Sequence, residues 1–92
     1  MRLSRRTSYR ADLSEIVHYI AQTDPAAALG IWDEIERQVE RLRDHPQSGR
    51  VGRVYGTREL VVAGTPFIVI YRIAQTVELF RVLHGARQWP PT

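Results

Sequence analysis

The first half of the chain has a hydrophobic pattern of helical period. Apolar residues recur at intervals of three and four positions: Leu13, Ile16, Val17, Ile20 and Ala21. Such spacing puts them on one face of an amphipathic helix, which we predict over about Ser8–Gln22. Asp24-Pro25 then combines a good N-cap residue with a proline at the first helical position, so a second helix begins there. Its apolar spacing continues to Arg43, and the short connection predicts an antiparallel helical hairpin.

The second half of the chain changes to the two-residue period of β-strands. Residues 44–56 contain one proline, three glycines and a serine, which is typical of a flexible loop. After them we expect strands over Thr57–Ala63, Phe67–Ile73 and Val77–His84. The short connections between these strands predict an antiparallel meander.

The predicted elements form a single domain. Residues 2–6 can form a further short strand before the first helix, and no repeat or linker divides residues 1–92. We therefore expect an α+β fold of order β-α-α-β-β-β, with both helices on one face of the sheet.

The charge distribution suggests an anionic partner. Residues 1–10 carry a charge of +4, residues 11–43 carry −4 and residues 44–92 carry +3. This asymmetry fits either nucleic acid or an acidic protein, although an ordinary solvated surface is the alternative. All thirteen basic residues are arginines, which bind phosphate and carboxylate with a bidentate fork.

Composition also narrows the cellular setting. The chain has no cysteine, which fits a reducing compartment and excludes thiolate metal sites. The N-terminal segment lacks the apolar core of a signal peptide, and the longest apolar stretch, Phe67–Tyr71, is too short to span a membrane. We expect a cytoplasmic protein without a membrane association.

Few residues offer catalytic or metal-binding chemistry. Glu15 and His18 form one Glu-x-x-His step, but a di-iron site needs two such steps, so we expect no metal. No nucleotide-binding lysine motif follows the glycines of residues 44–56, and we expect no cofactor. His84, with Arg81 and Arg87, is the only candidate set for metal-free RNA cleavage. Its second acid–base group is not evident; the nearby candidates are Glu59, Tyr71 and Tyr55.

The order of elements and several motifs resemble the RelE/ParE toxins of bacterial type II toxin–antitoxin systems. The motifs that carry the resemblance extend over the whole chain: Ala11-Asp12-Leu13, Ile16, Tyr19-Ile20, Asp24-Pro25-Ala26-Ala27, Pro46, Gly49-Arg50, Gly56-Thr57-Arg58-Glu59-Leu60, Tyr71-Arg72-Ile73, Arg81-Val82-Leu83-His84-Gly85-Ala86-Arg87 and Trp89. The resemblance implies a toxin that is neutralised by a cognate antitoxin within a hetero-oligomer.

The resemblance leaves two targets open. RelE-like members cut mRNA on the ribosome and carry an arginine where this chain has Phe67; their basic tail residue matches Arg87, but no tail tyrosine follows Trp89. The ending resembles ParE, so we favour inhibition of DNA gyrase by binding, with the ribosome-dependent mRNA endonuclease as the alternative. A double-stranded RNA-binding module is less favoured, because its helices come in a different order. We expect target contacts from Arg58, Arg72, Arg81, His84, Arg87 and Trp89.

The antitoxin contact is predicted from the sheet. The strand over Thr57–Ala63 is a candidate edge strand, and an edge strand can accept an added strand from a partner. The expected partner is an acidic, partly disordered segment that also lays a helix over apolar surface. The predicted antitoxin-binding residues are Leu60, Val61, Val62, Arg81 and Arg87.

Overall fold

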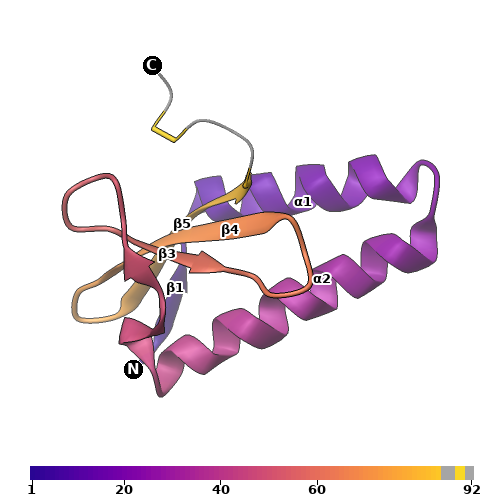
Figure 1. Ribbon diagram of the computed structural model, residues 1–92. Helices are drawn as coiled ribbons and strands as arrows, with labels where there is room; N and C mark the ends of the chain where they lie inside the picture. Colours follow the sequence, from indigo (N-terminus) through magenta and orange to yellow (C-terminus); the bar gives the residue numbers. More distant parts are fainter. Residues whose placement is uncertain (86–88, 91–92) are drawn as a thin grey trace.

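The first half of the chain folds as the expected helical hairpin. The computed structural model describes residues 1–85 and 89–90. Helix α1 spans Thr7–Ala21 and helix α2 spans Pro25–Glu40. Asp24 caps α2, because its carboxylate accepts a hydrogen bond from the Ala27 N–H at 3.0 Å. The hairpin reaches beyond the sheet at the α1–α2 turn (Figure 1).

The end of α2 and the following loop are more ordered than predicted. Helix α2 ends three residues before Arg43, and Arg41–Arg43 continue as a tight 3-10 turn, η1. A second 3-10 turn, η2, covers Pro46–Ser48, and Arg50–Val51 form a short strand, β2. Within the predicted loop of residues 44–56, Pro46–Ser48 and Arg50–Val51 thus form regular elements, and the prediction of a flexible loop was wrong for them.

The remaining strands confirm the predicted α+β fold. They are β1 (Leu3–Arg5), β3 (Arg58–Val61), β4 (Phe67–Ile73) and β5 (Val77–His84). The described residues form one sheet of order β1-β5-β4-β3-β2. β1 runs parallel to β5, and the other neighbouring pairs are antiparallel.

The core lies between the helical hairpin and one face of the sheet. Tyr9 and Leu13 of α1 and Ile35 of α2 are almost completely buried there. The sheet and the end of β3 contribute further core residues: Val62, Phe67, Val69, Tyr71, Val77, Leu79 and Val82. Both helices thus pack on one face, as predicted, and we call the opposite face the outer face.

An irregularity in β5 alters which side chains reach the outer face. Ile70 is paired with Arg81, whereas its neighbour Tyr71 is paired with Leu79, so Phe80 is an extra residue in β5. Such a bulge shifts the alternation of the strand by one. Phe80 and Arg81 both lie on the outer face as a result.

Candidate functional site

Two side chains of α1 close part of the β5 edge. β1 pairs with β5 only as far as Leu79. Beyond that point the Ser8 hydroxyl donates to the Phe80 carbonyl at 2.5 Å, and the Val82 N–H donates to Asp12 Oδ2 at 3.0 Å. Backbone groups that would otherwise be free for another strand are thereby occupied.

Asp12 also fixes the position of Arg81. The guanidinium donates from Nε to Asp12 Oδ2 at 2.6 Å and from Nη2 to Oδ1 at 3.2 Å. This hydrogen bonding raises the pKa of Arg81. The carbon of the guanidinium group lies 5.9 Å from the centre of the Trp89 ring. Arg81 therefore joins α1 to the indole that covers part of the outer face.

Two further arginines lie over the Phe80 ring on the outer face. The guanidinium carbons of Arg6 and Arg72 are 5.2 Å and 5.4 Å from its ring centre, distances typical of cation–π contacts. Both arginines also pair with Glu78, at 3.7 Å for Arg6 and 2.5 Å for Arg72. Arg72 therefore has an acidic partner on the neighbouring strand β5.

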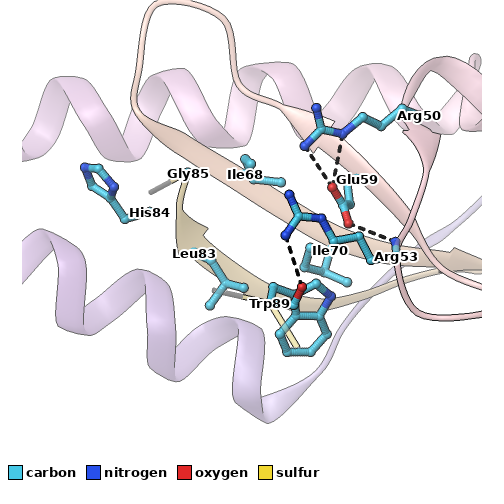
Figure 2. Close-up of a pocket in the computed structure, with 9 residues that line it drawn as sticks. All are labelled: Arg50, Arg53, Glu59, Ile68, Ile70, Leu83, His84, Gly85 and Trp89. Carbon is cyan, nitrogen blue, oxygen red and sulfur yellow. Dashed lines mark hydrogen bonds and ion pairs between the residues drawn. The ribbon is translucent and has the colours of Figure 1, made fainter. Parts of the chain in front are cut away.

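Glu59 holds the 50–53 segment against the sheet. This buried carboxylate accepts hydrogen bonds from the Arg50 side chain at 2.9 and 3.0 Å and from the Arg53 backbone N–H at 3.1 Å. Arg53 also donates to the Trp89 carbonyl at 3.5 Å. Figure 2 shows these groups around a small pocket. Glu59 thus has a structural role, fastening a loop and, through Arg53, the tail.

The candidate nuclease residues are not brought together. The His84 ring packs edge-on against Phe67, with ring centres 5.9 Å apart, on the face that carries the helices. Figure 2 shows His84 pointing away from Glu59 and Trp89, whereas Arg81 lies on the outer face. The prediction that Arg81 and His84 act side by side was wrong, because they are three positions apart in a regularly paired part of β5 and alternation puts them on opposite faces. Arg87 lies outside the described residues.

The two tyrosines considered as acid–base groups have other settings. Tyr71 is fully buried; its hydroxyl donates to the Pro46 carbonyl at 2.6 Å and accepts from the Gly49 N–H at 2.9 Å. Burial raises its pKa. Tyr55 is fully exposed. Neither tyrosine is placed to exchange a proton with His84.

Arg58 and His18 are also engaged in local structure. Arg58 shares a face with Tyr71 and therefore does not lie on the outer face. Its Nη1 donates to the Gly49 carbonyl at 2.8 Å and so holds the loop that precedes β2. His18 Nδ1 lies 2.7 Å from the Ser14 carbonyl oxygen, one turn earlier in α1. Among the described residues, no group of three or more histidines and carboxylates could hold a metal ion.

The edge predicted to bind the antitoxin is not free. β2 pairs with β3 through Arg50 with Glu59 and Val51 with Arg58. At the other end, Gln38 of α2 donates to the Ala63 carbonyl at 2.8 Å and accepts from the Ala63 N–H at 2.9 Å. The prediction that Thr57–Ala63 is an edge strand was therefore wrong. Gln38 is a polar residue within the apolar stripe of α2, and that misfit was a signal in the sequence.

The apolar residues chosen on that strand differ in exposure. Val62 is fully buried in the core, and Leu60 packs against the core from a half-buried position. Val61 has 51% of its surface exposed. Strand alternation puts Val61 on the face opposite to Leu60 and Val62, so the three residues do not form one contact surface.

An apolar groove lies instead between α1 and the sheet. Ile16, Tyr19 and Ile20 of α1 form one wall, and Phe67 and Val82 form the other. The groove has a volume of about 340 Å³, with carboxylates and an imidazole along it: Asp12, Glu15 and His84. Sequence reasoning missed the groove because its two walls come from opposite halves of the chain.

The fold and the sequence match known toxins. Residues 3–89 match the family described as the ParE toxin of the type II toxin–antitoxin system parDE. Y4kP of Sinorhizobium fredii, which is named as a toxin, is 46% identical over 78 residues, covering 85% of this chain and 81% of that protein. A chain of the chromosomal ParDE system from P. aeruginosa superposes with a TM-score of 0.81 at 28% identity, covering 91% of this chain and 95% of that one. No helix in the described part of the chain is long and apolar enough to cross a bilayer. The chain belongs to the ParE toxin family of type II toxin–antitoxin systems.

Proposed function

We propose that this ParE-family toxin acts by binding DNA gyrase and not by cutting RNA. The observation that supports the proposal is the separation of His84 from Arg81 across the two faces of the sheet. Metal-free RNA cleavage needs an acid–base group and a cation within reach of the same phosphate. The described residues do not place His84 and Arg81 around one phosphate.

The proposed target surface is the outer face. Of the residues predicted to contact the target, Arg72, Arg81 and Trp89 gather there, beside Phe80. Aromatic and arginine side chains are the residue types enriched in the energetic centres of protein interfaces. Glu78 holds Arg72 and Asp12 holds Arg81, so these two arginines lose little side-chain entropy on binding.

We further propose that the cognate antitoxin occupies the groove between α1 and the sheet. An amphipathic helix could place apolar side chains against Ile16, Tyr19 and Phe67. This mode replaces strand addition at β3, where β2 and Gln38 already occupy the backbone. A Tyr19→Asp variant should be toxic but poorly neutralised, because a carboxylate in an apolar contact is costly.

Two parallel assays test the target. The purified chain should inhibit gyrase supercoiling, and added antitoxin should restore it. The same preparation should leave message intact on translating ribosomes. Codon-dependent cleavage with unaffected supercoiling would establish the mRNA endonuclease alternative, and growth unaffected by the soluble chain alone would contradict a toxic activity altogether.

A further inference from the structure

The outer face contains a hollow between two aromatic rings. Phe80 and Trp89 line it together with Ser8, Thr57, Ile70 and Arg81, and its volume is about 260 Å³. We call it the aromatic hollow. Its volume is several times the ~30 Å³ that one water molecule takes up in the liquid. A flat, apolar group of a ligand therefore fits it better than a few isolated waters.

Arginines surround the aromatic hollow. Arg6 and Arg72 lie over the Phe80 ring, and Arg81 lies over the Trp89 ring. Only two carboxylates pair with these three cations, because Arg6 and Arg72 share Glu78. The side chains of Arg6 and Arg72 are 49% and 46% exposed. The rim of the hollow thus has a net positive charge with N–H donors accessible to a ligand.

We propose that the aromatic hollow binds a base of a single-stranded nucleic acid. The base would stack on the rings of Phe80 and Trp89, and Arg6 and Arg72 would contact the adjacent phosphates. Proteins that bind single strands without sequence preference combine aromatic stacking with a cationic path for the backbone. Arginine guanidinium planes add to such stacking.

One further feature favours a nucleic acid strand over an extended peptide. A peptide added to this face would gain most from backbone pairing, but the adjoining β5 edge is closed by Ser8 and Asp12. Base stacking needs no backbone partner.

Binding of a strand here would not lead to its cleavage. Neither His84 nor Glu59 lines the aromatic hollow, and the arginine that does is held by Asp12. The inference goes beyond gyrase inhibition and uses the same face, so a bound strand and the protein target would compete for Phe80 and Trp89.

A single-tryptophan protein allows a direct test. Trp32→Phe removes the other tryptophan, which is exposed on α2, and leaves Trp89 as the reporter. Oligo(dT) and oligo(rU) of roughly 12 nucleotides, within the site sizes of single-strand binders, are the probes. Titration should quench Trp89 emission, and the affinity should fall as salt rises. A preference between the two probes distinguishes DNA from RNA as the natural source.

Matched variants separate stacking from general charge. In the Trp32→Phe background, Phe80→Leu should weaken oligonucleotide binding by about 5- to 150-fold, and Phe80→Tyr should retain binding, because only the ring is needed. Arg72→Gln should weaken binding and lower the salt slope by about 0.7. Arg37→Gln is the control, since it removes the same charge from a remote position on α2 beside Glu34.

Several results would overturn the inference. They are no change of Trp89 emission with either probe at low salt, equal losses for Arg37→Gln and Arg72→Gln, or unchanged affinity of a folded Phe80→Leu variant. Tighter binding of duplex than of single strands would also overturn it. Gyrase inhibition without oligonucleotide binding would contradict this inference alone, and oligonucleotide binding without gyrase inhibition would contradict the proposed function alone.

Discussion

Replacing Asp12 with alanine should destabilise the protein far more than loss of a surface charge would. The Asp12 carboxylate accepts three hydrogen bonds, two from the Arg81 side chain and one from the Val82 backbone. The Asp12 and Arg81 side chains are only 14% and 29% exposed. Truncation would leave a part-buried cation and an edge N–H without an acceptor, whereas an exposed ion pair contributes ~0–1 kcal/mol.

The expected magnitude follows from these contacts. A hydrogen bond to a charged group contributes about 1.5–3 kcal/mol, and an orphaned buried donor costs about 1–3 kcal/mol. Because water can reach part of Arg81, we expect the free energy of unfolding to fall by a total of roughly 2–3 kcal/mol. In a domain of this size each kcal/mol lowers the Tm by about 4–8 °C, so the Tm should fall by roughly 8–24 °C.

Thermal and urea unfolding followed by circular dichroism would measure this loss. The control is Asp33→Ala, which removes the same charge from an exposed position on α2. Amide hydrogen exchange should also accelerate at Val82 more than at core positions of β4. If Asp12→Ala and Asp33→Ala lower the Tm equally, or if Val82 keeps its protection, then Asp12 does not hold the β5 edge.

Three further predictions concern packing, pH and toxicity. A Cβ at Gly49 would lie 2.5 Å from Tyr71 Oη, whereas a Cβ at Gly30 in α2 would have no neighbouring atom within 4 Å. In urea unfolding, Gly49→Ala should therefore be less stable than the wild type by about 1–3 kcal/mol, and Gly30→Ala should be more stable by about 0.5–1 kcal/mol. Burial raises the pKa of Tyr71 above its usual 10.0. The contribution of Tyr71 to stability is therefore complete below pH 10 and is lost above it, as the phenol of the unfolded chain ionises. The Tm of the wild type should fall more steeply between about pH 9.5 and 11 than that of Tyr71→Phe, and parallel curves would exclude Tyr71 as the cause of the pH dependence. If the toxin acts by binding, Arg87→Ala should reduce growth arrest more than His84→Ala, and the reverse order would favour RNA cleavage, because loss of a general base costs about 10²–10⁴ in rate.

Periodicity was sufficient to predict the helical hairpin and the three longer strands. The bounds of β4 and β5 agree with the sequence pattern, because turn residues at 64–66 and 74–76 delimit the two strands. The pattern could not predict β2, since a two-residue strand has no period of its own. It also could not predict the bulge at Phe80, which depends on pairing with β4.

The candidate site was only partly predictable for the same reason. Arg72, Arg81 and Trp89 were recognised individually, but their meeting with Phe80 and Arg6 depends on the sheet and on α1. His84 was assigned next to Arg81 from its distance along the chain. Strand alternation over three positions puts the two side chains on opposite faces, which reversed that assignment.

The parallel pairing of β1 with β5 has a consequence for the timing of toxin production. Leu3–Arg5 are made first, but their only strand neighbour among the described residues is Val77–Leu79, near the other end of the chain. A nascent chain on the ribosome therefore cannot complete its sheet until Leu79 has been added. Long-range pairing of this kind also slows folding. An interval consequently separates synthesis of the toxin from the first appearance of its outer face, and a partner already present in the cell could use that interval to bind.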